Sequence, residues 1–127
     1  MGNEVAKLTA VIEKTGTGFS GYIKEVDGIV STGDSLAEIK ENLQEALELI
    51  YGDSTNIDLN YVIDLGQFFE YFNVINKSAF ADYIGMNRSL FRQYSGGLTN
   101  LSDNKLLDIT KGLHRLAKDF SDIVLVK

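Results

Sequence analysis

The sequence contains no cysteine, no proline and no tryptophan, and it has a single histidine, His114. Without cysteine the chain has no disulfide framework, no thiolate metal site and no cysteine nucleophile. One histidine gives little material for a multi-histidine metal site or a Ser-His-Asp triad. These absences favour a binding protein over an enzyme, and we expect no catalytic residues, no metal and no cofactor.

Long hydrophobic runs are also missing. No apolar stretch approaches the roughly 20 residues of a membrane span, and no basic segment followed by an apolar one opens the chain as a secretory signal would. We therefore expect a cytoplasmic protein that does not contact a membrane. The 127 residues are 44% hydrophobic and 24% charged, which is typical of a globular protein with one domain or two small ones.

The net charge of −6 is distributed unevenly along the chain. Residues 1–73 contain 4 lysines and 13 acidic residues, a balance of −9. Residues 74–127 contain 8 lysines and arginines and 5 aspartates, a balance of +3. The asymmetry predicts two units with different partners: a basic partner for the first, and phosphate for the second. The alternative is chance, since small helical domains often carry a few net charges.

The first half has the alternating pattern of a small sheet. Residues 6–13 alternate apolar and polar side chains, which is typical of a strand with one buried face. Glycine-rich residues 15–18 and the pair Asp27-Gly28 are turn sequences. The expected strands are therefore residues 6–13, 19–26, 29–32 and 59–63.

One helix is expected between the third and fourth strands. Ser35 and Glu38 have the spacing of a capping box, and Gly52 is a typical helix end. Four glutamates at helical spacing form an acidic face: Glu38, Glu41, Glu45 and Glu48. This order predicts an α+β chain that opens, over residues 1–63, with a small three- to four-stranded sheet and one covering helix.

The second half, residues 64–127, is predicted to be all-helical apart from its last residues. An apolar stripe in the last helix is formed by Leu106, Ile109, Leu113, Leu116 and Phe120, with Gly112 as a candidate bend. Residues 123–126 are β-prone and are expected either to pair with a partner chain or to pack. The expected helices cover residues 65–72, 78–84, 88–94 and 103–119.

Two short helices at residues 78–94 have the spacing of a helix-turn-helix. Ala81 is small where the helices cross, and Gly85 stands where the first helix ends with a positive φ. Met86 supplies an apolar turn residue, and Phe91 anchors the second helix. The alternative is an ordinary helical hairpin with a solvated polar face.

The exposed polar residues of this pair suit DNA. Arginine pairs with guanine, glutamine with adenine and serine with either, and a recognition helix presents its first residues to the major groove. The start of the first helix is suited to phosphate. The predicted DNA-binding residues are Lys77, Ser78, Asn87, Arg88, Ser89, Arg92 and Gln93.

Residues 81–89, with sequence ADYIGMNRS, resemble the helix-turn-helix of the lambda-repressor-like family. The resemblance implies that the positions of Arg88, Ser89 and Arg92 face DNA, and that those of Ala81 and Phe91 are core. Where the family commonly has glutamine, this chain has Lys77, which favours phosphate over a base. The resemblance extends to about residue 120.

Residues 33–38 (GDSLAE) and 42–47 (NLQEAL), together with Gly21-Tyr22 and Gly28, resemble the HicB antitoxin family. The resemblance implies a partial RNase H-like sheet that masks HicA, a small basic mRNA-cleaving toxin. It also implies a C-terminal DNA-binding domain that represses the shared operon. The expected partners are therefore this toxin, operator DNA and further copies of the chain, in a homodimer or a higher even oligomer.

Two other functions compete with the antitoxin. A stand-alone helix-turn-helix regulator would use its first domain to dimerise or to sense a ligand. A metal-dependent nuclease would need converging carboxylates, for which the sequence offers Glu13, Glu25, Asp27 and Asp34 by count only.

Overall fold

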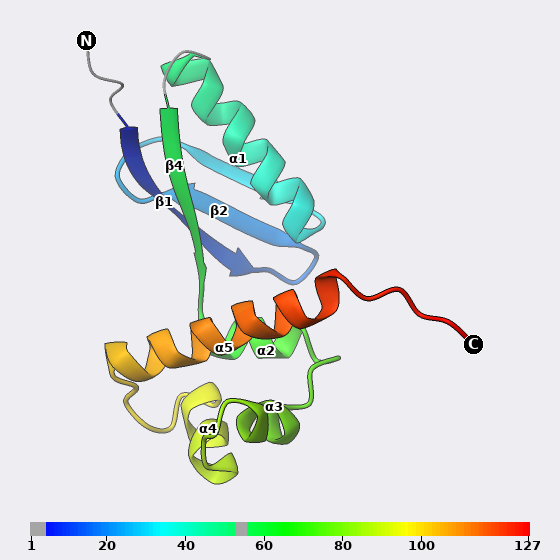
Figure 1. Cartoon of the computed structure of the whole chain (residues 1–127). Coiled ribbons are helices and arrows are strands. Elements are labelled where there is room, and N and C mark those ends of the chain that lie inside the picture. The colour runs from blue at the N-terminus through cyan, green and yellow to red at the C-terminus, as the bar shows by residue number, and fades with distance from the viewer. Residues whose placement is uncertain (1–4, 53–55) are drawn as a thin grey trace. The chain divides into compact units, whose positions relative to one another are not determined.

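The structure is a computed structural model that describes residues 5–52 and 56–127. This part of the chain has a four-stranded mixed sheet and five helices, which confirms the predicted α+β class. The chain divides into two compact units, residues 1–71 and 72–127. In order, the elements are β1 (Val5–Lys14), β2 (Phe19–Ile23), β3 (Val30–Gly33), α1 (Leu36–Tyr51), β4 (Asn56–Ile63), α2 (Leu65–Tyr71), α3 (Lys77–Tyr83), α4 (Arg88–Ser95) and α5 (Asp103–Ser121) (Figure 1).

The sheet of the first unit has the order β3-β2-β1-β4. β1 pairs with β2, and β2 with β3, in antiparallel fashion, whereas β1 pairs with β4 in parallel. In this register Ile12 lies opposite Gly21 on one side and Ile63 on the other. A parallel pair needs a long crossover connection, and α1 lies in the connection that leads to β4.

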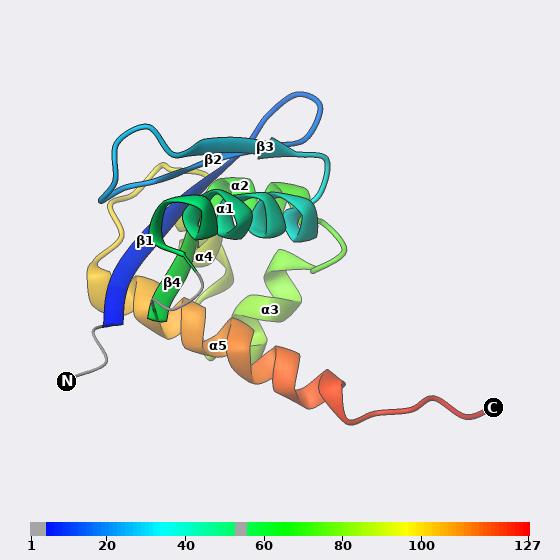
Figure 2. The same ribbon diagram turned by 90° about the horizontal axis from the view of Figure 1, so that it is seen from above.

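α1 lies along one face of the sheet (Figure 2). Every second residue of β1 points into this layer, and α1 contributes one residue per turn. The helix sits close because glycines face it: a Cβ on Gly21 would lie 2.9 Å from Leu43 Cδ1. The buried residues of the layer are Leu8, Ala10, Ile12, Phe19, Ile23, Ile29, Ile39, Leu43 and Leu47.

The ends of α1 follow the predicted signals. The Ser35 hydroxyl accepts the backbone N–H of Glu38 at 3.1 Å, and Gly52 ends the helix with φ of +76°. Strand bounds differ more. β2 ends at Ile23 instead of residue 26, because the chain turns there and the Ile23 N–H donates to the Ile29 carbonyl.

By its contacts, the first unit extends through α2 to Tyr71, whereas the sequence predicts α2 as part of the second unit. The Gln67 side chain accepts the backbone N–H of Lys14 at 3.0 Å. The ring of Tyr71 packs edge-on against Phe19, with centroids 4.8 Å apart. An amphipathic helix between two units can join either, so its periodicity does not say which.

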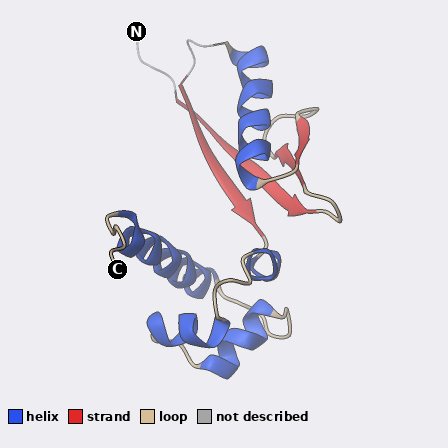
Figure 3. Cartoon of the chain, turned by 90° about the vertical axis from the view of Figure 1, so that its right-hand side faces the viewer, coloured by secondary structure: helices blue, strands red, loops and turns tan. Residues whose placement is uncertain are grey.

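The second unit contains helices but no strand among its described residues (Figure 3). Its buried apolar side chains come from three helices: Phe80, Ala81, Phe91 and Ile109. The predicted stripe of α5 is buried only in part, since Phe120 is 65% exposed. With 19 residues, α5 is much longer than the seven-residue α3. Residues 123–126 form no strand within the described chain.

Candidate nucleic-acid interface

Local capping signals set the geometry of α3, the turn and α4. Asn76 caps α3 by accepting the Ala79 N–H at 2.9 Å. Gly85 has φ of +73°, a conformation that favours glycine. Asn87 then caps α4 by accepting the Leu90 N–H at 3.0 Å. Two asparagine caps and one glycine therefore fix where each short helix begins and where the first one ends.

The two helices pack through the residues that the sequence analysis identified. Ala81 and Phe91 are fully buried, and the rings of Phe80 and Phe91 lie 5.6 Å apart. Met86, in the turn, donates its backbone N–H to the Ala81 carbonyl at 2.8 Å. The core roles predicted for Ala81 and Phe91 are thus confirmed.

The predicted DNA-binding residues lie at the start of α3, at the cap and start of α4 and, for Arg92 and Gln93, in the second half of α4. Lys77 and Ser78 are half-buried at the start of α3. The Arg92 guanidinium donates from Nη2 to the Ser78 hydroxyl at 2.7 Å, so the start of α3 and the face of α4 meet. The predicted residues that are exposed are Asn87, Arg88, Ser89, Arg92 and Gln93.

Two further residues, Asp82 and Thr99, contact this face, and neither is predicted from the sequence. The Arg88 guanidinium binds the carboxylate of Asp82, with Nε at 2.9 Å from Oδ1. These hydrogen bonds lower the pKa of Asp82. Thr99 donates its hydroxyl to the side-chain oxygen of Gln93 at 3.0 Å. The residues of each pair are six apart, with a turn between them. The pairs therefore do not follow a helical repeat, and periodicity in the sequence does not reveal them.

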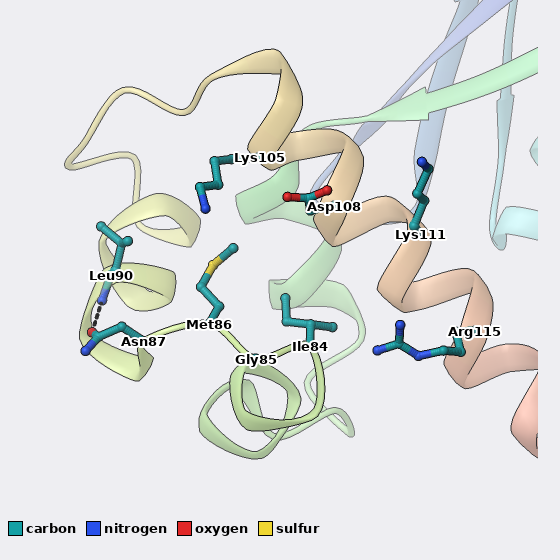
Figure 4. Close-up of a pocket in the computed structure, with 9 residues that line it drawn as sticks. All are labelled: Ile84, Gly85, Met86, Asn87, Leu90, Lys105, Asp108, Lys111 and Arg115. Atoms are coloured by element: carbon teal, nitrogen blue, oxygen red, sulfur yellow. Dashed lines mark hydrogen bonds between the residues drawn. The ribbon is translucent and has the colours of Figure 1, made fainter.

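A pocket of about 400 Å³ lies between α5 and the turn that joins α3 to α4 (Figure 4). The turn side is formed by residues 84–87 and Leu90, and α5 contributes three cations and one carboxylate. Beside it the packing is tight, since a Cβ on Gly112 would lie 2.3 Å from Ile84 Cγ2. Gly112 therefore acts as a close-packing residue. The charged residues from α5 are Lys105, Asp108, Lys111 and Arg115.

Tyr83 connects α3 to α5. Its hydroxyl donates to Asp119 Oδ2 at 2.5 Å. The Arg115 guanidinium lies over the Tyr83 ring at 4.8 Å and donates to its backbone carbonyl at 3.3 Å. These contacts hold α3 against the long helix, so the candidate interface rests on a three-helix scaffold.

The carboxylates of the first unit are spread over its surface. The acidic face of α1 is exposed along its length. Glu25 accepts the Thr9 N–H at 2.7 Å and the Thr9 hydroxyl at 2.8 Å, and these hydrogen bonds lower the pKa of Glu25. Across residues 5–52 and 56–127, no three histidine, aspartate or glutamate side chains gather as a metal site would require.

Comparison with known proteins finds similarity over part of the chain. A UPF0150 protein of Helicobacter pylori strain J99 is 41% identical over 46 residues, which is 36% of this chain and 64% of that protein. The chain thus covers less than two thirds of this relative. No family model and no solved structure matches the chain. Within the described residues, no helix combines the length and apolarity that crossing a bilayer requires.

Proposed function

We propose that the chain is an antitoxin with two binding surfaces. The first unit, with a partial RNase H-like fold, neutralises a small basic mRNA-cleaving toxin of the HicA type. The second unit, a lambda-repressor-like helix-turn-helix, binds the operator of its own operon and represses it. The assembled protein is a homodimer or a higher even oligomer, and both activities are binding rather than catalysis.

The DNA-binding role is supported above all by the contact between Arg92 and Ser78. It places an exposed arginine of α4 beside the start of α3. In a helix-turn-helix, the second helix lies in the major groove while the first helix crosses the DNA backbone, so the two lie side by side at the DNA. Arg88 and Gln93 are exposed on the same helix. The unit carries +3, so the field around this face attracts phosphate.

The antitoxin role is supported by the relative and by charge. UPF0150 is the HicB-like family, and the strand-strand-strand-helix-strand order of the first unit suits a partial RNase H-like sheet. The first unit carries −9. A toxin that binds RNA is expected to be positive, and complementary potentials speed association and select partners.

Two cell-based assays test the two activities separately. In the first, the neighbouring small basic protein is induced alone and with this chain, and we expect growth arrest that the chain relieves. In the second, the upstream promoter drives a reporter. We expect repression by the chain and loss of repression in the Arg88→Ala/Arg92→Ala variant, which should still relieve growth arrest.

The outcomes distinguish the functions that the sequence leaves open. Repression without any arresting neighbour would contradict the antitoxin role and identify a stand-alone regulator. Relief of arrest without repression would contradict the operator-binding role. Cleavage of RNA by the purified chain, lost in Asp34→Asn, would contradict a purely binding function.

A further inference from the structure

The face of the sheet opposite α1 carries four apolar side chains in one row. Val11 of β1 lies opposite Tyr22 of β2 and Val62 of β4, and Tyr22 lies opposite Val30 of β3. Residues opposite one another point to the same side of a sheet, and Ile12, next to Val11, is buried in the layer under α1. We name the set Val11, Tyr22, Val30 and Val62 the outer row. With strands about 4.8 Å apart, it spans about 14 Å.

The outer row is exposed. Tyr22, Val30 and Val62 are 42%, 67% and 44% exposed, and Val11 is half-buried. Within the four strands as described, Val5 is the one further apolar residue on this face. The four strands thus have their apolar exceptions at one level, which makes a contiguous patch and not scattered single residues. The other residues that point to this side are polar, as a face in water requires: Lys7, Thr9, Glu13, Ser20, Thr32, Asn56, Asp58 and Asn60.

Carboxylates flank the outer row on both sides. Glu13 lies two residues beyond Val11 in β1 and is exposed on the same face. Two residues before Val11, Thr9 holds Glu25 in place, since its backbone N–H and its hydroxyl donate to the Glu25 carboxylate at 2.7 and 2.8 Å. The row therefore has the arrangement of a protein interface, with an apolar, tyrosine-containing centre and a polar rim.

The charge around the row selects the partner. Lys24 has the carboxylate of Glu25 beside it, and Lys7 lies opposite Asp58 in the register, so these lysines do not make the face basic. The first unit as a whole carries −9. Duplex DNA or a second copy of this unit would bring like charges together, which opposes association. The occupant that fits is a basic protein with an apolar patch.

We propose that the outer row is the docking surface for a basic protein, whose apolar side chains cover the row and whose cations meet the carboxylates around it. This identification rests on the proposed function, in which the basic protein is the toxin. The four glutamates of α1 point away from the sheet and carry charge without an apolar centre among them. They add to the attraction, whereas the outer row supplies the contact.

Polar substitutions in the row test the docking directly. The purified chain is titrated into the fluorescently labelled small basic protein encoded next to it. In Tyr22→Thr/Val62→Thr, threonine keeps the β-branched shape that strands favour but removes apolar contact, and we expect the dissociation constant to rise at least tenfold. The matched control, Leu49→Gln/Ile50→Gln, removes two side chains of α1 that are 88% and 59% exposed. It should bind like the natural chain.

A charge in the row gives a second test with little risk to the fold. Val30 is the most exposed member of the row and belongs to the edge strand β3, where lysine is well tolerated. Val30→Lys would repel a basic partner, so we again expect at least a tenfold rise in the dissociation constant. Leu49→Lys places the same charge on α1 and should have no such effect. Melting temperatures from circular dichroism show that each variant is folded.

The outcomes separate this proposal from the proposed function. If the natural chain and both row variants bound the basic protein equally well, the docking surface would lie elsewhere and the antitoxin role would stand. If the row variants changed only the oligomeric state in sedimentation equilibrium, the row would be a contact between copies. If the natural chain did not bind the basic protein at all, the antitoxin role and this docking would both be contradicted. Operator repression should be unchanged in the row variants.

Discussion

The guanidinium of Arg88, the first residue of α4, lies against the carboxylate of Asp82 in α3, with Nε at 2.9 and 3.1 Å from the two oxygens. Nη2 also donates to this carboxylate. The pair joins the two sides of the turn, and both partners are more than half exposed. An exposed ion pair adds little stability, so its main effect is to orient Arg88.

Replacing Asp82 therefore tests orientation. Asp82→Asn removes one negative charge beside the candidate interface and releases the guanidinium from a charged partner. We expect tighter binding to scrambled DNA, because phosphate repulsion falls, and a lower ratio of specific to scrambled affinity, because Arg88 is less well placed. Competition binding with both DNAs measures this ratio. Asp122→Asn, just after α5 and exposed, controls for the charge, and an unchanged ratio in Asp82→Asn would argue against orientation.

Gly112 is expected to control how closely α5 approaches the turn. A methyl group in Gly112→Ala would lie 2.3 Å from Ile84 Cγ2, and overpacking costs about 1–3 kcal/mol. Better helix propensity returns only about 1 kcal/mol, so we expect a lower free energy of unfolding, by up to about 2 kcal/mol. Urea denaturation measures it. Gly16→Ala, whose Cβ would have no neighbour within 4 Å, is the control, and equal stability of the two variants would contradict the packing argument.

Position 33, just before the Asp34-Ser35 pair at the start of α1, has no room for a side chain. A Cβ on Gly33 would lie 2.6 Å from the backbone nitrogen of Ile39, and backbone cannot move aside as a flexible side chain does. We expect Gly33→Ala to destabilise the first unit by about 2 kcal/mol or more. Thermal unfolding followed by circular dichroism should show a lower melting temperature for the first unit. A melting curve like that of the natural chain would refute the close approach.

The hydrogen bonds from Thr9 to Glu25 predict a pH dependence. They hold the pKa of Glu25 below its ordinary value, so they stabilise the fold above the pKa of the unfolded chain. This contribution is lost as the pH falls through the lower, folded pKa. Glu25→Gln should therefore be less stable than the natural chain at pH 7, and the difference should shrink below about pH 4.

Urea denaturation at several pH values checks this dependence. Asp27→Asn removes a nearby negative charge and serves as the control. A stability difference between Glu25→Gln and the natural chain that stays constant from pH 7 to pH 3 would show that Glu25 ionisation is not linked to folding.

Much of the fold could be predicted because its signals are local. Ser35, Gly52 and Gly85 set helix ends through their own hydroxyl group or φ angle, and the structure places each as expected. The parallel pairing of β1 with β4 could not be predicted, because it joins residues about 50 apart and leaves no local pattern. The same holds for α2, whose partners Lys14 and Phe19 precede it by about 50 residues.

The residues of the candidate interface also divide into those with a local sequence signal and those without one. Spacing alone identified the scaffold at Ala81, Gly85 and Phe91, since a helix pair must cross closely somewhere. Spacing could not identify Asp82 or Thr99, because each reaches its partner across a turn. Phe120 continues the helical stripe in sequence yet is exposed, because periodicity records a face and not what covers it.

The most direct test of the account measures binding of the purified chain to its own upstream DNA by fluorescence anisotropy, across a salt series and beside scrambled DNA. We expect selective binding that Arg88→Ala and Arg92→Ala each weaken by about 1–3 kcal/mol, whereas Lys118→Ala, with the same charge change on α5, keeps the selectivity. If all three variants bound upstream DNA and scrambled DNA with the same affinities as the natural chain, the assignment of α4 as the recognition helix would be contradicted.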